Sequence, residues 1–272
     1  MPGFTRRTVV TLLLCLATAL SAYGNEPPPR LNELLARSGY SEQIYQFSNV
    51  MKHSISRIHQ LGLCDQRSRD IITRSIEIAI SPEFISSQLS SDLTRQVTPE
   101  EIDKLLAWYE SPLGSRIANL EIASSHPETH PRMKQEAEKL FANTKRVELA
   151  KKINEISEGT RWAVNIEMQS KIAMLSALAQ IQKKPIGANL VELASQLEEQ
   201  KAEMAPYVEE AILLWYLYTY QDLKEEEINQ YISFLATEKS RHFNRVALDS
   251  IASSITKVTE DFLVDIAKSA KE

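Results

Sequence analysis

Cysteine is scarce in this chain, which carries two cysteines among 272 residues. Cys15 lies in an N-terminal segment that we expect to be removed, which leaves Cys64 as the single thiol of the mature protein. One thiol excludes an internal disulfide, so core packing must hold the fold, and about 248 residues are enough for that. An exported protein without structural disulfides fits a bacterial periplasm better than a small extracellular scaffold.

Glycine is also rare, with seven residues in the whole chain, and this leaves few positions for tight turns. No stretch sustains the strict alternation of apolar and polar residues that is typical of a half-buried strand. Apolar residues instead recur three or four positions apart, which places them on one face of a helix. Two such stripes are Phe47, Met51, Ile55, Ile58 and Leu61, and Val164, Met168, Ile172, Leu175 and Leu178. We therefore predict an all-α fold built from amphipathic helices.

Long hydrophobic runs are missing apart from one near the N-terminus. Arg6-Arg7 precedes the mostly apolar residues 9–22, and small residues at Ala22 and Gly24 suit a signal peptidase. This order is typical of a Sec-type secretory signal, and the run is shorter than the roughly 20 residues of a membrane span. We predict a signal peptide over residues 1–24, cleavage near Gly24, a periplasmic location and no transmembrane span in the mature chain.

An excess of basic residues is missing too. The chain has 31 Lys and Arg against 36 Asp and Glu, and removal of residues 1–24 takes away two arginines and no acids. The mature balance is therefore 29 against 36, a net charge of −7. Binding to nucleic acid needs a concentrated basic face that neutralises phosphates. We expect no nucleic-acid partner.

Catalytic motifs are equally hard to find. No Ser/His/Asp grouping, phosphate-binding glycine loop or dinucleotide fingerprint occurs. Neighbouring carboxylates in the runs Glu198-Glu199 and Glu225-Glu226-Glu227 point about 100° apart on a helix, so they do not converge on one substrate. Cys64 follows His59, but no third residue is in place to orient that base. We predict no catalytic residues and no cofactor.

The nearest approach to a metal motif is the segment from His126 to His130, which reads His-Pro-Glu-Thr-His. It differs from the His-Glu-x-x-His helix of zinc hydrolases because the glutamate is one position late. Pro127 and Pro131 disfavour a continuous helix, so spacing alone does not bring the imidazoles onto one face. We predict no metal site and keep His126, Glu128 and His130 as weak candidate ligands in a polar loop.

The most informative stretch is Thr98–Gly114, because a degenerate repeat of it follows 126 positions later. Its apolar positions and their copies are Ile102, Leu105, Leu106 and Tyr109, and Ile228, Tyr231, Ile232 and Leu235. In the first copy Thr98 and Glu101 form a capping box, and Ser111-Pro112 starts another helix after a kink. In the second copy, Thr237, Glu238 and Ser240 take the places of Ser111, Pro112 and Gly114. Because the proline and glycine are gone, we expect one longer or gently bent helix over residues 225–268.

The acidic helix start, the Trp108-Tyr109 pair and Ser111-Pro112-Leu113-Gly114 resemble the signature of domain-of-unknown-function family 2059. The resemblance is specific over Thr98–Gly114 and looser over residues 31–145, and in the second copy the apolar spacing alone survives. It implies an all-helical, bacterial, periplasmic protein. It implies no catalytic residues, because the family signature offers none to carry over.

The repeat predicts two tandem related helical-bundle units. A Pro-rich linker covers residues 25–30, the first unit covers residues 31–145, and a degenerate second unit covers residues 146–272. A repeat offset of 126 residues indicates duplicated domains rather than a solenoid, whose units are roughly 20–50 residues long.

The most apolar mature segment runs from Ile212 to Tyr220. Its aromatic side chains are too close in sequence to share one helical face, so we interpret the segment as buried on most sides. The alternative is an aromatic groove that binds a ligand, because Tyr and Trp suit partly wet surfaces. The candidate groove residues are Trp108, Tyr109, Trp215, Tyr216, Tyr218 and Tyr220.

These patterns favour a binding or interaction module of the bacterial cell envelope. The expected partner is an envelope protein, a peptide or a lipid. The alternative is an enzyme whose site is assembled between the two units from distant carboxylates and histidines. That alternative requires a polar cleft that contains titratable groups with perturbed pKa values.

Overall fold

The computed structural model describes residues 29–45, 66, 81–168 and 190–269. Every regular element in these ranges is a helix, which confirms the predicted all-α fold. The signal segment, the stripe from Phe47 to Leu61, Cys64 and the residues from Ile172 to Leu178 lie outside the described residues.

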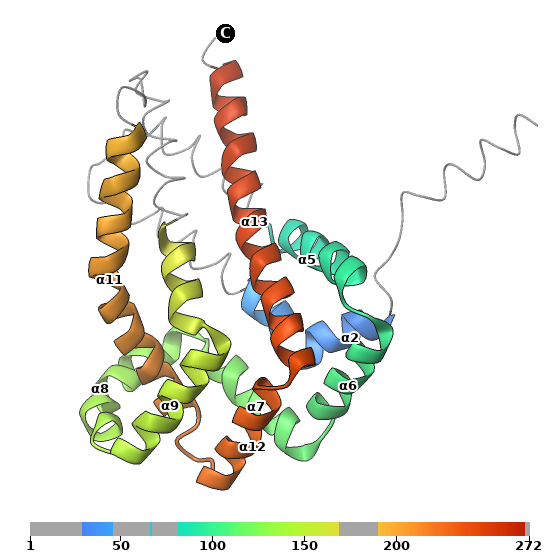
Figure 1. Cartoon of the computed structure of the whole chain (residues 1–272), viewed down its shortest axis with the longest axis vertical. Coiled ribbons are helices and arrows are strands. Elements are labelled where there is room, and N and C mark those ends of the chain that lie inside the picture. The colour runs from blue at the N-terminus through green and yellow to red at the C-terminus, as the bar shows by residue number, and fades with distance from the viewer. Residues whose placement is uncertain (1–28, 46–65, 67–80, 169–189, 270–272) are drawn as a thin grey trace, which may run out of the picture.

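The labelled helices follow one another through both halves of the chain (Figure 1). They are α2 (Pro29–Arg37), α5 (Pro82–Gln96), α6 (Pro99–Tyr109), α7 (Pro112–Ser124), the 3₁₀ turn η2 (Pro127–Thr129), α8 (His130–Phe141), α9 (Thr144–Ser157), α11 (Leu190–Thr219), α12 (Glu225–Leu235) and α13 (Glu238–Ser269). Residues 40–45 and 159–168 are helical as well. Helix α2 begins at Pro29, so its first two residues lie within the predicted Pro-rich linker of residues 25–30.

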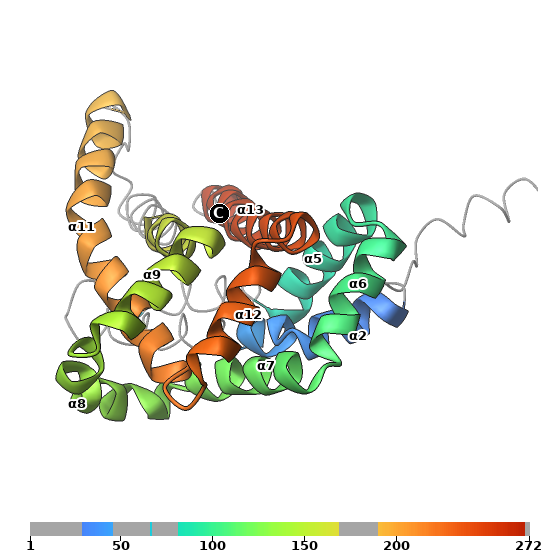
Figure 2. The same ribbon diagram turned by 60° about the horizontal axis from the view of Figure 1, so that its bottom comes forward.

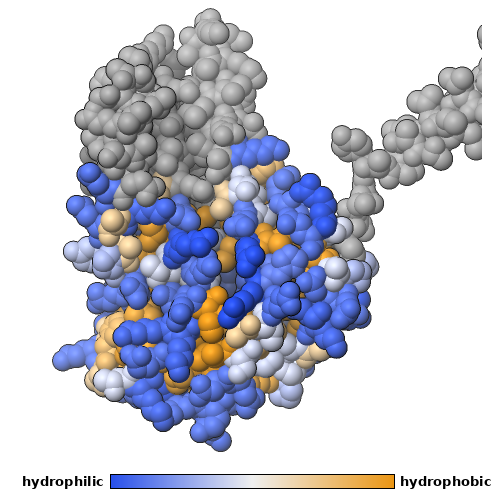
Figure 3. Space-filling view, in the orientation of Figure 1, coloured by the Kyte–Doolittle hydropathy of each residue, from blue (hydrophilic) through white to orange (hydrophobic). Residues whose placement is uncertain are grey.

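One hydrophobic core joins the two halves of the chain. The long helix α13 packs along α5, while α11 packs against α8 and α9, and α12 against α9. Figure 2 shows α12 and α13 lying beside α5, α6 and α7, far from them in sequence. The core cluster includes residues from Leu31 to Ile251 and is continuous across residue 145, the predicted boundary between units. The outer face in Figure 3 is mainly hydrophilic, with hydrophobic side chains visible between the helices.

Capping hydrogen bonds set the start of α6 and of α7. The Thr98 hydroxyl accepts from the Glu101 amide at 3.3 Å, and the Glu101 carboxylate accepts from the Thr98 amide at 2.8 Å, which confirms the predicted capping box. Ser111 Oγ accepts from the Gly114 amide at 3.1 Å and so caps α7. Pro112 begins α7, where its missing N–H is not needed. The predicted kink between the helices is confirmed.

The predicted continuous helix over residues 225–268 is wrong. Helix α12 ends at Leu235 and α13 begins at Glu238. Thr237 Oγ1 accepts from the Ser240 amide at 3.3 Å and donates to the Phe234 carbonyl at 2.7 Å. Ser111 makes the same two bonds 126 positions earlier, including one of 2.6 Å to the Trp108 carbonyl. A capping hydroxyl is sufficient to begin a helix, so the break survives without proline.

Two polar contacts between α6–α7 and α12–α13 involve residues that are related by the same offset of 126 positions. Glu101 Oε1 lies 2.9 Å from His242 Nδ1. Glu227 Oε1 lies 3.0 Å from Arg116 Nη1. Glu227 stands 126 positions after Glu101, and His242 stands 126 positions after Arg116. The two contacts are therefore reciprocal under this offset, as contacts across a two-fold interface are.

A stacked ring pair lies at the centre of this reciprocal pattern. Trp108 and Phe234, which stands 126 positions later, stack with ring centroids 4.4 Å apart and planes 7° apart. Such a pair contributes about 0.5–1.5 kcal/mol beyond the burial of its area. The stack joins α6 to α12 and places the two helix pairs face to face.

Candidate functional site

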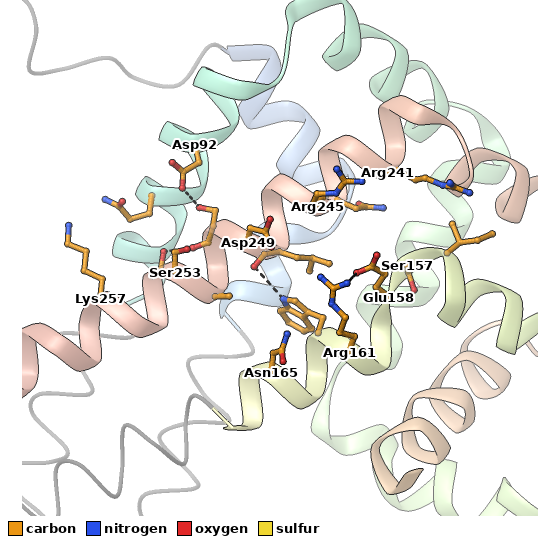
Figure 4. A pocket seen from close by; sticks show the side chains of 18 of the residues that line it. Asp92, Ser157, Glu158, Arg161, Asn165, Arg241, Arg245, Asp249, Ser253 and Lys257 are labelled. Carbon is orange, nitrogen blue, oxygen red and sulfur yellow. Dashed lines mark hydrogen bonds and ion pairs between the residues drawn. The ribbon is translucent and has the colours of Figure 1, made fainter. Parts of the chain in front are cut away.

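A cleft of about 1400 Å³ opens between α5, α13 and residues 155–165 (Figure 4). The wall formed by α13 contributes side chains four residues apart, which share one face of the helix. They are Arg241, Arg245, Asp249, Ser253 and Lys257. The opposite wall contributes Glu158, Arg161 and Asn165, and Asp92 comes from α5. The cleft is therefore lined mainly by polar and charged groups of both signs.

Three interactions among the lining residues fix the walls of the cleft. Ser250 Oγ donates to Asp92 Oδ2 at 2.7 Å, which ties α13 to α5. Trp162 Nε1 donates to the Leu248 carbonyl at 3.4 Å, which ties α13 to the facing segment. Arg161 Nη1 lies 2.8 Å from Glu158 Oε2. The first two hydrogen bonds join α13 to the other walls of the cleft. The remaining charged side chains of the described lining take no part in joining these walls.

Several charged side chains of the cleft remain available. Arg241, Arg245, Asp249 and Lys257 are exposed, and within the described residues none of them makes a hydrogen bond or ion pair. Figure 4 shows Arg241 and Arg245 at one end with the Glu158–Arg161 pair, and Lys257 with Asp92 at the other. Such an arrangement can hold an elongated polar ligand by hydrogen bonds to groups of both signs.

Sequence reasoning did not identify this cleft. The signal was present in α13, where Arg241, Arg245, Asp249, Ser253 and Lys257 recur every four residues. A polar stripe of this kind also marks the solvated face of any amphipathic helix. The facing residues lie about 80 positions earlier, and Asp92 earlier still, so spacing does not bring them together.

A second group of polar side chains is buried in the core around Glu121. The hydroxyls of Tyr220 and Tyr231 both donate to Glu121 Oε1, at 2.5 and 2.7 Å. Burial raises the pKa of Glu121, because a charged carboxylate loses its hydration there, while the two tyrosine hydrogen bonds oppose this rise. Burial, followed by the Glu121 charge, also raises the pKa of both tyrosines.

This buried cluster is closed to solvent. Glu121 is 9% exposed and Tyr220 is 3% exposed, and neither residue lines the cleft. The carboxyl group whose pKa is raised therefore lies in the closed core and not in the cleft. We interpret the cluster as part of the packing of α7 against α11 and α12.

The six candidate groove residues are packed side chains. Tyr109, Tyr216 and Tyr220 are buried in the core, and burial raises the pKa of Tyr216 to about 12. Trp108 stacks on Phe234, and the indole N–H of Trp215 donates to the Ser124 carbonyl at 3.3 Å. Tyr218 is half-buried. None of the six lines the cleft, and Tyr216 and Tyr220 border a separate, much smaller pocket beside α9.

The weak metal candidates occupy the turn between α7 and α8. His126 precedes the η2 turn, Glu128 lies within it, and His130 begins α8. Across the described ranges, no three His, Cys, Asp or Glu side chains gather as metal ligands. The structure therefore does not bring His126, Glu128 and His130 together as a site.

Comparison with known proteins identifies one family. Residues 87–143 match the family model described as "Uncharacterized protein conserved in bacteria (DUF2059)". This confirms the family recognised from Thr98–Gly114, and the matched residues extend from α5 to the turn before α9. The second copy predicted over residues 146–272 lies outside the match. No curated protein and no solved structure matches the chain.

Proposed function

We propose that this chain, which matches the DUF2059 family model over residues 87–143, is a binding module of the bacterial cell envelope. Its ligand occupies the cleft between α5, α13 and residues 155–165. The observation that carries this proposal is the row of exposed charged side chains on α13, which faces an open cleft without described partners.

The fold does not need these charges. Ser115, Asn119 and Ala123 of α7 occupy the positions that Arg241, Arg245 and Asp249 occupy in α13, 126 residues later. Both helices begin with the same hydroxyl cap, so the helix start tolerates small or neutral residues at these positions. At these positions the charged residues stand on α13 alone, where the cleft opens.

The size and polarity of the cleft favour a segment of another protein. Small-molecule pockets usually measure roughly 300–1,000 Å³ and are mainly apolar, whereas this cleft measures about 1400 Å³ and presents polar and apolar surface in nearly equal amounts. An extended polypeptide offers backbone donors and acceptors along its whole length, together with side chains of either sign. We therefore assign the cleft to an extended polar segment of an envelope protein.

The alternative of an enzyme receives less support from this cleft. Its described lining contains carboxylates such as Asp92 and Asp249 but no histidine or cysteine. General acid–base catalysis at neutral pH needs a group whose pKa is tuned toward that range. The described carboxylate with a raised pKa is Glu121, which lies in the closed core.

Site-specific crosslinking in living bacteria tests the binding proposal. A photoreactive amino acid replaces Ser253, which is exposed within the cleft, and in a control replaces Lys134, which is exposed on α8 outside it. We expect a discrete protein adduct from the Ser253 position and none from the Lys134 position. Equal adducts at both positions, or none at either, would contradict the proposal.

We also propose that the chain is exported and built from two duplicated units. The reciprocal pairs Glu101–His242 and Arg116–Glu227 support duplication, because each is the copy of the other. Across the described residues, no helix is both long and apolar enough to cross a membrane. Osmotic-shock release followed by N-terminal sequencing tests export, and a chain that retains residues 1–24 in the cytoplasm would refute it.

A further inference from the structure

We propose that Arg241 and Arg245 form a subsite for carboxylates, so that the segment bound in the cleft is acidic at one end. This inference rests on the proposed function, because it names the chemistry of the ligand that the cleft takes. The two side chains come from successive turns of α13 and lie at one end of the cleft (Figure 4).

The two guanidinium groups are positioned to act together. Residues four apart on a helix have Cβ atoms roughly 5–6 Å apart, so both groups reach one small region. Each guanidinium presents a planar set of donors that matches a carboxylate in a bidentate arrangement. Neither has an acceptor among the described residues, which leaves these donors free for a ligand.

Three arginines lie at this end of the cleft: Arg241, Arg245 and Arg161. Arg161 pairs with Glu158 at 2.8 Å, and Glu155 lines the same wall as Glu158. Asp249 follows Arg245 by one turn and marks the point where the sign of the wall changes. Like charges one turn apart repel each other in the free protein, and an acidic ligand relieves that repulsion.

The length of the charged row sets the length of the segment. Arg241 and Lys257 are 16 residues apart on α13, or about 24 Å at the rise of an α-helix. An extended chain advances about 3.3 Å per residue, so about seven residues span the row. The ligand is then a short extended segment with acidic residues near Arg241 and Arg245.

A membrane surface fits the row less well than a peptide does. The wall of α13 alternates in sign, from the two arginines through Asp249 to Lys257, whereas an anionic bilayer presents one sign of charge. The chain as a whole also carries a formal net charge of −5, which opposes association with anionic lipids.

Selection from a random heptapeptide display library on the purified, signal-processed chain tests the inference. We expect the wild-type protein to enrich peptides with Asp or Glu at neighbouring positions at one end. The variant Arg241→Gln/Arg245→Gln should lose that acidic preference and bind a selected wild-type peptide at least about 10-fold more weakly, because it removes two guanidinium groups and the loss of even one charge-assisted hydrogen bond has an effect of this size. The control Lys134→Gln/Lys139→Gln, exposed on α8, removes the same charge and should change neither result.

The outcomes separate the two proposals. Enrichment of peptides without an acidic preference, or an acidic preference kept by the Arg241→Gln/Arg245→Gln protein, overturns the carboxylate subsite but leaves the cleft as a binding site. Failure to enrich any peptide overturns both. Arginine-dependent binding to phosphatidylglycerol vesicles in the absence of peptide binding also overturns both, and circular dichroism of each variant verifies that it is folded.

Discussion

The buried carboxyl group of Glu121 offers the sharpest test of how the core is held. Its Oε1 atom accepts hydrogen bonds from Tyr220 and Tyr231, which lie 99 and 110 residues away in sequence. Glu121→Leu keeps a side chain of similar size but leaves both hydroxyls without their acceptor. Glu121→Gln keeps an acceptor oxygen and removes the ionisable group.

The hydrogen-bond geometry sets the expected magnitude. A buried hydroxyl that loses its partner costs about 1–3 kcal/mol, so Glu121→Leu should lower the free energy of unfolding by about 2–6 kcal/mol. Removing all three polar groups together, in Glu121→Leu/Tyr220→Phe/Tyr231→Phe, should recover most of that loss, because no unpaired hydroxyl remains. Urea unfolding followed by circular dichroism measures each variant. A Leu variant as stable as wild type, or a triple variant no more stable than the Leu variant, would refute the reasoning.

The pH dependence of the same site has a definite sign. Burial raises the pKa of Glu121 in the folded protein above its ordinary value. Its contribution to stability is therefore fully present below the unfolded pKa of about 4.3 and is lost as pH rises through the folded pKa. We expect the stability of Glu121→Gln relative to wild type to increase as pH rises above about 4.3. A relative stability that stays constant with pH would contradict the raised pKa.

Two further predictions concern the junctions between the helix pairs. A Cβ atom on Gly114 would lie 2.0 Å from the Trp108 carbonyl oxygen, so Gly114→Ala should cost about 1–3 kcal/mol in urea unfolding, whereas Ser115→Ala should change little. Burial raises the pKa of Glu101, but hydrogen bonds from Thr98 and His242 outweigh burial and lower it overall. The stabilisation of wild type relative to Glu101→Gln should therefore be present above about pH 4.3 and disappear as pH falls through the folded pKa, and an advantage that persists at pH 2 would contradict this.

The parts of the fold that local chemistry encodes could be predicted from the sequence. The capping box at Thr98 and the cap at Ser111 each involve residues three positions apart in the sequence, and both form as predicted. The break before α13 differs from the prediction because it depends on the hydroxyl of Thr237. The prediction was based on the absence of residues equivalent to Pro112 and Gly114. The cap itself supplies the hydrogen bond that starts a helix, and proline only adds to it.

The sites could not be predicted, because they depend on contacts between distant segments. A glutamate in a helix is usually exposed, and nothing near Glu121 in sequence indicates that Tyr220 and Tyr231 enclose it. The polar stripe on α13 can be recognised in the sequence, but a solvated helix face would show the same pattern. The residues that face it across the cleft belong to a different helix. The tertiary arrangement decides between these readings.

The proposed duplication distinguishes contacts that recur at an offset of 126 from features that do not. The contacts Glu101–His242 and Arg116–Glu227 are related by this offset and join the helix pairs. Glu121 and Arg245 are among the residues that depart from it, because Ala247 and Asn119 stand at the corresponding positions. Glu121 is enclosed by tyrosines and so adds to packing. Arg245 is exposed to solvent, and no described residue accepts from its guanidinium donors. Because this side chain neither recurs at the offset of 126 nor packs in the core, it is where we most expect a ligand.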